Sequence, residues 1–256
     1  MSVMTGTSGW QYRDWRGAFY PPGVPQRRWL EHYATQFATV ENNGTFYRLP
    51  SRETFASWRE RVTSDFVMTV KASRYLTHVR RLRDPAGPVR RLLDAAAGLG
   101  DRLGPVLLQL PPDLRAAPEA LRECLRQFPA AVRVAVEPRH ESWWTDEVRD
   151  VLVAANAALC WADRDGSAVT PLWSTADWGY LRLHEGDAVP WPSYREATLS
   201  GWAERIAATW GEADVYVYFN NDQNAAAPRD AARLAAAVTR RGGVSARAWK
   251  GWDAEG

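Results

Sequence analysis

The sequence is poor in cysteine, lysine and histidine, and each shortage narrows what the protein can be. The two cysteines, Cys124 and Cys160, are too few for a disulfide framework, and because one lies on a helix-like segment and the other in an apolar strand-like segment we expect two buried thiols. The four histidines have no HxH or HExxH spacing, which gives little support for a metal site. Only two of the 32 basic residues are lysines, Lys71 and Lys250, so arginine supplies almost every cation.

Long apolar runs are also absent. Nowhere do about 18 apolar residues follow one another, and the opening MSVMTGTSGW has no basic segment followed by an apolar one. We therefore expect a cytoplasmic protein without a membrane partner, and the oligomeric state stays open. The net charge of +2 is too small to indicate nucleic acid binding by itself. With 46% hydrophobic and 24% charged residues, the composition is typical of a folded globular protein.

Apolar runs bounded by turn residues recur along the chain and predict eight strands. These runs are Val3–Gly9, Thr39–Thr45, Phe66–Ser73, Pro105–Leu110, Val132–Glu137, Ala158–Asp163, Gly179–His184 and Asp214–Asn220. Between most of them lie helical patterns, such as Trp29, Tyr33 and Phe37, which recur every four residues. Strand followed by helix, repeated about eight times at about 32 residues a unit, is typical of a parallel sheet closed into a barrel. We predict an α/β fold over residues 1–256, a single (β/α)8 TIM-type barrel domain.

Two connections depart from the regular unit. Only Arg164–Trp178 separates the sixth and seventh strands, and with Pro171 this segment is expected to be a loop or one short turn. The link Arg74–Pro88 is long and rich in arginine, so we expect a basic, mobile flap over the pocket or a solvated surface loop. The tail after Gly242 is polar and is left unassigned.

The ends of the predicted strands carry side chains that can bind ligands or transfer protons. They are Ser8, Trp10, Glu41, Asn43, Lys71, Gln109, Glu137, Arg139, His140, Asp163, Arg182, His184, Asn220, Asn221 and Asp222. Barrel enzymes place their chemistry at the C-terminal ends of the strands. A strand that leaves the core also becomes polar as it meets water, but Glu41, Lys71, Glu137 and Arg182 lie in or directly after apolar runs and need partners there. The pattern indicates either a functional pocket or a structural network of ion pairs.

Within this set, Glu41, Lys71, Glu137 and His184 are the predicted catalytic residues. Glu41 and Glu137 could act as general acid and base across the mouth of a barrel, or could hold arginine side chains in place. The predicted substrate-binding residues combine oxyanion donors, amides and aromatic rings that could stack on a sugar or a base, or pack under the loops. They are Trp10, Asn43, Tyr47, Tyr75, Gln109, Arg139, His140, Arg182, Asn220, Asn221 and Asp222.

Lys71 stands out because it ends the apolar run 66–70 in a chain that otherwise uses arginine. Partial burial would favour its neutral amine, whereas a nearby Glu41 or Glu137 would favour the charged form. We expect Lys71 to be a functional group that requires a compact ammonium, so that Lys71→Arg keeps the fold but impairs function. If Lys71→Arg behaves as the wild type, Lys71 is only an ion-pair partner.

Several long strings together resemble one family. They are TSGWQYRDWRGAFYPP, VENNGTFYRLPSRETFASWRE, VKASRYLTH, GPVLLQLPP, RVAVEPRHESWW, YLRLH and VYVYFNND, and they cover almost the whole chain. The sequence resembles the domain of unknown function 72, also called YecE-like. The resemblance implies a TIM-type barrel, loosely similar to the xylose isomerase and endonuclease IV superfamily, and no particular activity. Residues 224–228 read NAAAP where the family tends to carry a glycine and a histidine, so no role is assigned to this loop.

Three functional classes follow from these features. The first is a hydrolase or lyase on a small phosphorylated ligand or nucleic acid, favoured by the arginines of 74–91 and the oxyanion donors at the strand ends. The second is a sugar-acting barrel enzyme with paired carboxylates, and the third is a non-catalytic protein that binds a ligand or nucleic acid. No cofactor is predicted, since there is no Walker loop and no GxGxxG after a strand. A divalent metal site, formed by His78, His140 or His184 with nearby carboxylates, is kept as an alternative by analogy with the nuclease superfamily.

Overall fold

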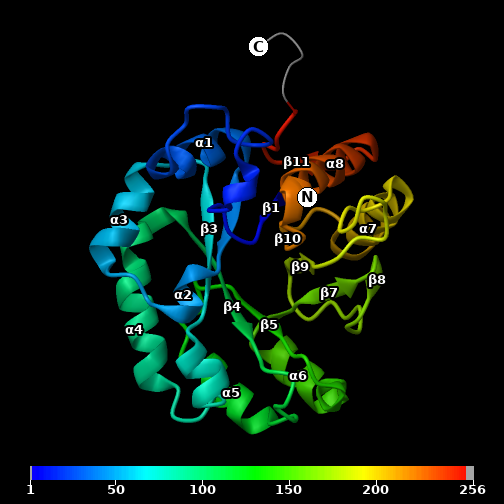
Figure 1. Cartoon of the computed structure of the whole chain (residues 1–256). Helices are drawn as coiled ribbons and strands as arrows, with labels where there is room; N and C mark the ends of the chain where they lie inside the picture. Colours follow the sequence, from blue (N-terminus) through cyan, green and yellow to red (C-terminus); the bar gives the residue numbers. More distant parts are fainter. Residues whose placement is uncertain (1, 252–256) are drawn as a thin grey trace.

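The computed structural model describes residues 2–251, and it contains the predicted alternation of strands and helices (Figure 1). The strands are β1 (Ser2–Thr7), β2 (Thr39–Asn42), β3 (Val67–Lys71), β4 (Leu103–Gln109), β5 (Val134–Glu137), β6 (Ala158–Leu159), β7 (Trp161–Arg164), β8 (Ser167–Ala168), β9 (Gly179–Leu183), β10 (Val215–Phe219) and β11 (Val244–Ser245). Each of the eight predicted segments overlaps a strand, and the sixth is divided into β6 and β7 at Cys160.

The strands form two sheets. One has the order β11-β1-β10-β9-β7-β8 and the other the order β2-β3-β4-β5-β6. Every pair is parallel except β7 and β8, which form an antiparallel hairpin. Parallel strands end at the same edge of a sheet, so the polar residues at the ends of the predicted strands are brought to one edge.

The prediction of one continuous closed barrel is only partly confirmed, because the strand pairing is broken in two places. Between β1 and β2 the pairing is limited to an isolated parallel bridge, Ser8 with Glu41. At the other junction, Cys160 N–H donates to Val136 O on β5, while β7 turns away to pair with β9. What the structure establishes is an α/β fold with two parallel sheets that meet at these points.

Gly6 on β1 lies where the two sheets come closest. A Cβ atom at this position would be 2.3 Å from the carbonyl oxygen of Thr39 on β2, which no real side chain could tolerate. The glycine therefore lets the backbones of β1 and β2 approach, and it brings Ser8 beside Glu41 two residues later.

Helices follow most of the strands and surround them (Figure 1). The α-helices are α1 (Trp29–Gln36), α2 (Gly44–Tyr47), α3 (Arg52–Glu60), α4 (Ala86–Ala96), α5 (Pro118–Arg126), α6 (Asp146–Ala154), α7 (Glu196–Trp210) and α8 (Ala226–Arg240). Short 3-10 turns are η1 (Arg13–Trp15), η2 (Gln26–Arg28), η4 (Ala97–Arg102), η5 (Glu141–Trp143) and η6 (Gln223–Ala225), and η3 (Tyr75–Val79) is a π-helical turn. The hydroxyls of Ser51 and Thr145 accept backbone N–H bonds that begin α3 and α6.

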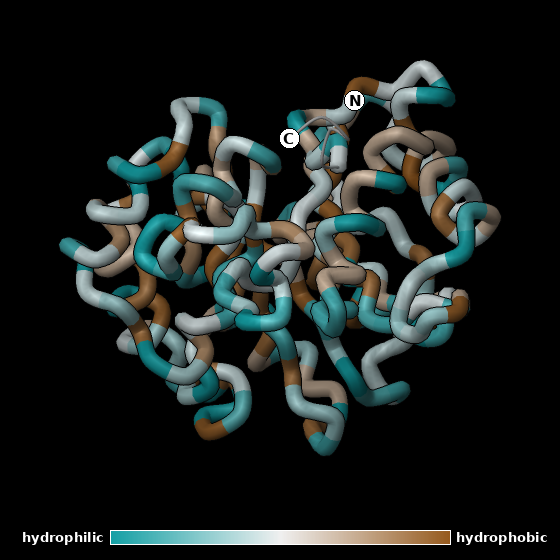
Figure 2. Tube along the Cα trace, turned by 45° about the horizontal axis from the view of Figure 1, so that its top comes forward, coloured by the Kyte–Doolittle hydropathy of each residue, from teal (hydrophilic) through white to brown (hydrophobic). Residues whose placement is uncertain are grey.

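Apolar side chains fill two layers. The larger cluster joins the helices to the strands, and a second lies between the two sheets and includes Leu107 on β4, Tyr180 on β9 and Tyr218 on β10. Figure 2 shows apolar segments running through the middle of the molecule and hydrophilic segments on the outer loops. Both cysteines are free and buried, as predicted. No helix within residues 2–251 combines the length and apolarity needed to cross a membrane.

The irregular connections differ in part from expectation. The sixth and seventh predicted strands are joined without a helix, as predicted, but the segment between them contains the hairpin strand β8. The arginine-rich link is not an extended flap, because η3 occupies its start and Leu76 and Leu82 are buried in the core. The tail after Gly242, left unassigned above, adds β11 beside β1.

Candidate functional site

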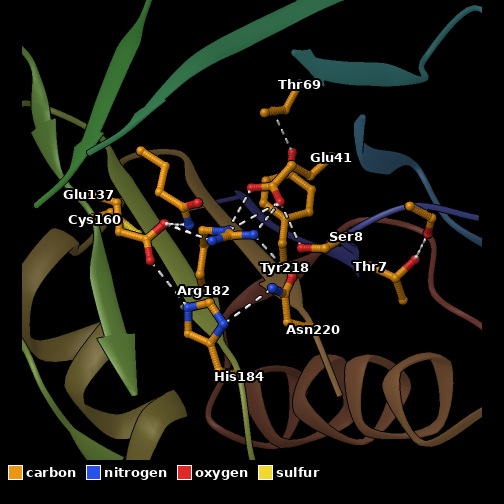
Figure 3. Close-up of polar contacts among 12 residues, drawn as sticks. Thr7, Ser8, Glu41, Thr69, Glu137, Cys160, Arg182, His184, Tyr218 and Asn220 are labelled. Carbon is orange, nitrogen blue, oxygen red and sulfur yellow. Dashed lines mark hydrogen bonds and ion pairs between the residues drawn. The ribbon is translucent and has the colours of Figure 1, made fainter. Parts of the chain in front are cut away.

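Arg182 on β9 is the centre of a buried polar network between the two sheets (Figure 3). Its Nε and Nη2 donate to Glu41 on β2, with Nε at 3.0 Å from Oε2 and Nη2 at 3.0 Å from Oε1. Its Nη1 donates to Glu137 Oε2 on β5 at 2.7 Å. The guanidinium is 1% exposed and forms a planar fork between two carboxylates, a geometry that lysine cannot provide.

Glu41 lies on the closed side of this network and is fully buried. Besides Arg182, its carboxylate accepts hydrogen bonds from Ser8 Oγ at 2.7 Å and from the Tyr180 hydroxyl. Burial, with the charge of Glu41 acting in the same direction, raises the pKa of Tyr180 well above its usual range, so the phenol stays a donor. Glu41 is thus saturated with hydrogen-bond donors.

Glu137 lies on the open side of the network and also has a donor for each oxygen. Oε2 accepts from Gln109 Nε2 and Arg182 Nη1, each at 2.7 Å. Oε1 accepts from Arg139 Nη2 at 3.2 Å and lies 3.3 Å from His184 Nε2. Although burial acts to raise it, the pKa of Glu137 is held well below its usual range by Arg182, with His184 and Arg139 acting in the same direction.

The tautomer of His184 follows from its neighbours. Asn220 Oδ1 accepts from Arg182 Nη2 at 3.2 Å, so the Asn220 amide must point its Nδ2 toward His184 Nδ1, 3.2 Å away. The His184 Nδ1 atom is then an acceptor and the ring proton lies on Nε2, which faces Glu137. Arg182 therefore orients the imidazole through two partners at once (Figure 3).

Asp163 at the end of β7 is held differently. It is 1% exposed, and its Oδ1 accepts from the His184 backbone N–H at 2.7 Å and from the Tyr194 hydroxyl at 2.8 Å. Its Oδ2 is buried and has no hydrogen-bond partner within residues 2–251. Burial raises the pKa of Asp163 to about 7, and its hydrogen bonds offset this only in part. A carboxyl group in this state is a proton donor or acceptor near neutral pH.

A cavity of about 660 Å³ opens over these groups at the C-terminal ends of β5, β7, β9 and β10. Its wall contains carboxyl, guanidinium, imidazole, amide and indole side chains. The lining residues are Pro112, Glu137, Pro138, Arg139, Glu141, Trp144, Ala162, Asp163, Arg164, Val169, Thr170, His184, Glu185 and Asn220. A larger cavity of about 910 Å³ lies between α8 and the segment 245–251, but no described residue of its lining carries a carboxyl, imidazole or thiol group. The smaller cavity is therefore the candidate site.

Two arginines of the cavity differ in their partners. Arg139, whose side chain is 41% exposed, is paired with Glu137. Arg164 is exposed, and within residues 2–251 no carboxylate oxygen lies within 4.0 Å of its guanidinium. A free guanidinium of this kind can bind an oxyanion through two parallel hydrogen bonds.

Lys71 lies beside the network and outside the lining of the cavity. It is 8% exposed, and its Nζ lies 4.5 Å from the centroid of the Phe46 ring. Burial lowers the pKa of Lys71 to about 8, with Arg182 acting in the same direction and Glu41 and Glu137 opposing. Across the described part of the chain, no carboxylate lies within 4.0 Å of Nζ, so Lys71 is not the ion-pair partner of either glutamate.

The structure brings together only part of the predicted set. Glu137, Arg139, His184 and Asn220 line the cavity, and Gln109, Arg182 and Glu41 support it from below. Trp10 and Asn43 line a separate cavity of about 280 Å³ beside β1 and β2.

The remaining predicted residues lie elsewhere. Tyr47 is 81% exposed and Tyr75 is 46% exposed. His140 Nδ1 accepts the Ser142 backbone N–H at the start of η5, which gives it a local structural contact.

The residues after β10 serve mainly to hold the chain. Asn221 donates to Pro192 O at 3.0 Å and to Asp230 Oδ2 at 2.8 Å, which fixes α8 to the loop before α7. Asp222 is half-buried, its Oδ1 has no partner among the described residues, and burial raises its pKa to about 8. Its backbone oxygen accepts from Trp15 Nε1.

The cavity contains groups that the predicted site omitted. Asp163 was noted at the end of a predicted strand. The others, which follow the predicted strands by one or more residues and show no distinctive sequence pattern, are Arg164, Glu141, Trp144 and Glu185. Of these four residues, Arg164 and Glu185 directly follow predicted strands, so a search of the residue after each predicted strand would have found them and missed the other two. No three His, Cys, Asp or Glu side chains within residues 2–251 are grouped closely enough to hold a metal ion.

Two arginines of the arginine-rich segment are paired with carboxylates, while Arg74, Arg83, Arg90 and Arg91 are exposed. Arg80 pairs with Asp84, and Arg81 pairs with Asp113 across the loop after β4. These exposed ion pairs neutralise part of the charge that the sequence suggested for binding a polyanion.

Comparison with known proteins gives a consistent result. The sequence model described as "Protein of unknown function DUF72" matches residues 4–251. The chain is 24% identical over 254 residues to the UPF0759 protein YunF of Bacillus subtilis (strain 168), covering 86% of this chain and 89% of that protein. A DUF72 family protein of Thermotoga maritima MSB8 superposes with a TM-score of 0.79 at 26% identity, over 94% of this chain and 99% of that chain. For one of Enterococcus faecalis V583 the TM-score is 0.77 at 17% identity, over 93% and 95%. This chain therefore belongs to the DUF72 family of proteins of unknown function.

Proposed function

We propose that this protein is an enzyme of the hydrolase or lyase class that acts on a small phosphorylated ligand in the 660 Å³ cavity. The observation that carries the proposal is the pairing, on one cavity wall, of an oriented imidazole with two arginines. His184 is held between Glu137 and Asn220, and Arg139 and Arg164 lie on the same lining. Oxyanion recognition together with an acid–base group is the combination that phosphoester chemistry requires.

We also propose that the two sheets close into a single (β/α)8 barrel. Hydrogen bonds cross from one sheet to the other, from Tyr218 on β10 to Thr39 and Thr69, and from Arg182 on β9 to Glu41. The apolar cluster between the sheets supports the same view, as it would form the interior of the barrel. The cavity then lies at the C-terminal face, where barrel enzymes place their active sites.

Each group has a role in this proposal. Arg164 and the exposed part of Arg139 bind the phosphoryl oxygens. His184 accepts a proton at Nδ1 from a ligand hydroxyl or a water molecule that displaces the Asn220 amide from this nitrogen, and the ionised Glu137 stabilises the charged imidazole through Nε2–H. Glu41 and Arg182 are positioning residues, because both are enclosed and saturated by their partners.

The geometry gives less support to the two alternatives. Paired carboxylates of a sugar-acting enzyme need oxygens that are free to reach the substrate, whereas Glu41 and Glu137 share one guanidinium and have no oxygen without a donor. A nucleic acid surface needs clustered positive charge, whereas the lining of the cavity carries the acidic residues Glu141 and Glu185 beside its arginines.

Binding of inorganic phosphate, measured by isothermal titration calorimetry, tests the recognition step. We expect Arg164→Gln to weaken binding about tenfold or more, because a charge-assisted hydrogen bond contributes about 1.5–3 kcal/mol. Arg195→Gln, which changes an exposed arginine outside the cavity lining, is the matched control and should bind as the wild type. If phosphate does not bind, or if Arg164→Gln binds equally well, the proposal is wrong.

Turnover of p-nitrophenyl phosphate and of its diester tests the chemical step. His184→Asn should lower kcat about 100-fold or more while phosphate affinity changes little, since acid–base catalysis contributes about 10²–10⁴-fold. A wild-type protein that binds phosphate but turns over neither ester would instead be a binding protein, the non-catalytic class.

A further inference from the structure

We infer that Asp163 is a further hydrogen-bond donor of the cavity, an inference that rests on the proposed function. The carboxylic acid form of Asp163 donates Oδ2–H to an oxygen of the bound tetrahedral oxyanion. No proton needs to be transferred in this step, because the acid donates a hydrogen bond and keeps its proton. The inference adds to the arginines a donor whose presence depends on pH.

The orientation of the carboxyl group is fixed from one side. Oδ1 accepts from the His184 N–H and from the Tyr194 O–H, and these two bonds hold the plane of the group. Among residues 2–251, no group makes a hydrogen bond to Oδ2, although Asp163 is 1% exposed and lines the cavity. A buried ionised oxygen without a donor is costly, whereas a protonated one only lacks an acceptor, which an oxyanion in the cavity would supply.

Charged groups of both signs surround Asp163, and the nearby carboxylate of Asp187 favours the protonated form. From the segment after β9, Asp187 acts to raise the pKa of Asp163, in addition to the larger effect of burial. Glu185 on the same segment lines the cavity, as do Arg164 on β7 and Glu137 and Arg139 at the end of β5. His184 on β9 touches Asp163 through its backbone N–H, and its imidazole faces Glu137.

This arrangement selects the ligand by its protonation state. An oxyanion without a proton of its own can accept from Asp163 Oδ2–H and from the guanidiniums at once. When Asp163 loses its proton, the carboxylate repels the same ligand across a buried wall. Oxyanion affinity should therefore fall as the pH rises through about 7, where Asp163 ionises.

Inorganic sulfate is the suitable probe, because its charge does not change across the neutral pH range. We expect the affinity of the wild-type protein for sulfate to fall about tenfold between about pH 6 and about pH 8, in proportion to the protonated fraction of a group with a pKa near 7. Asp163→Asn should bind sulfate with an affinity that does not change with pH, because the amide keeps a donor and cannot ionise. The matched control Glu185→Gln, a carboxyl-to-amide change on the same wall, should keep the wild-type pH dependence.

The outcomes separate this inference from the proposed function. If Asp163→Asn keeps the pH dependence, Asp163 is not the titrating group and the inference is wrong. Wild-type affinity that is independent of pH also overturns it, while oxyanion binding itself would stand. If neither sulfate nor phosphate binds at any pH, both ideas fall. A carbon NMR titration of the wild-type carboxyl groups gives a reading that needs no variant: an Asp163 signal that titrates near pH 4 excludes the inference even if Asp163→Asn does not fold.

Discussion

Glu137 and Asp163 line the same cavity, yet the protein shifts the pKa values of the two carboxyl groups in opposite directions. On the β5 side, Glu137 receives donors at both oxygens from Gln109, Arg139, Arg182 and His184, and its pKa is held well below the usual range. On the β7 side, Asp163 is as deeply buried, but Oδ1 accepts from two neutral donors, the His184 N–H and the Tyr194 hydroxyl, and burial raises the pKa of Asp163 to about 7.

The difference teaches that burial alone does not decide the charge of an acid. Desolvation acts in the same direction on both groups, and the outcome depends on whether a buried cation lies opposite. Two titratable groups whose surroundings drive their pKa values apart are typical of acid–base sites. Lys71 extends the contrast to cations, because it is buried without a carboxylate partner while Arg182 has two.

The largest change in the free energy of unfolding is expected from removing Arg182, the cation that pairs with Glu137. Arg182→Met would leave Glu41 and Glu137 buried without the cation that they share, and breaking a buried ion pair in this way typically costs about 3–5 kcal/mol. Urea unfolding at neutral pH measures this loss. Arg195→Met is the control: its ion pair with Asp187 is 3.8 Å long and 69% exposed on the arginine side, so the change should stay within about 0.5 kcal/mol. Equal unfolding midpoints for Arg182→Met and the wild type would show that the network does not carry the stability assigned to it.

Asp163→Asn is expected to change the free energy of unfolding by a smaller amount, and to raise it. The pKa of Asp163 is raised from 3.8 to about 7 in the folded state, so between these pH values the folded protein keeps a proton that the unfolded chain releases. Wild-type stability should therefore fall as the pH rises from about 4 to about 7. Asparagine avoids this loss, and at about pH 8 we expect Asp163→Asn to be more stable than the wild type by about 2–4 kcal/mol.

The pH dependence of that difference is the decisive measurement. At about pH 3 the two proteins should unfold at similar urea concentrations, because the carboxyl group is then largely protonated in both folded and unfolded wild-type chains. Asp222, whose pKa is raised to about 8, contributes to the slope of both proteins and cancels in the comparison. A gap between the two curves that is constant with pH would mean that Asp163 is ionised in the folded protein.

The smallest change in the free energy of unfolding is expected from replacing Lys71, which has no carboxylate partner within residues 2–251. Lys71→Met should raise the stability at about pH 7 by about 1 kcal/mol, since methionine removes a charge that burial disfavours and loses only the contact with Phe46, worth about 0.5–1 kcal/mol. The gain should shrink as the pH rises from about 8 to about 10.5, because the wild-type amine then becomes neutral and wild-type stability increases. Lys71→Arg, which stays charged, should show no gain. A loss of stability in Lys71→Met would indicate that the ammonium has a partner.

Much of the fold was predictable because it depends on local patterns. Apolar runs placed all eight predicted strands, and stripes such as Trp29 and Tyr33 placed the helices that cover them. The π-helical turn η3 and the hairpin strand β8 were missed, since each is a short element whose backbone depends on its surroundings. The break of the sixth strand at Cys160 was also missed, because an apolar run gives no sign of a change of partner.

By itself, the sequence determined that polar side chains would gather at one edge of the sheets, because parallel strands end together and most of the predicted strands end on or beside a polar residue. It also identified Glu41, Glu137 and Arg182 as buried groups in need of partners. Only the tertiary structure decided which partners they found. Arg182 closes on both glutamates across the two sheets, Lys71 meets the ring of Phe46, and Asp163 keeps one oxygen without a donor. The physical reason is that a charge state depends on distances across the molecule and on access to water, neither of which is encoded in the order of residues along a single strand.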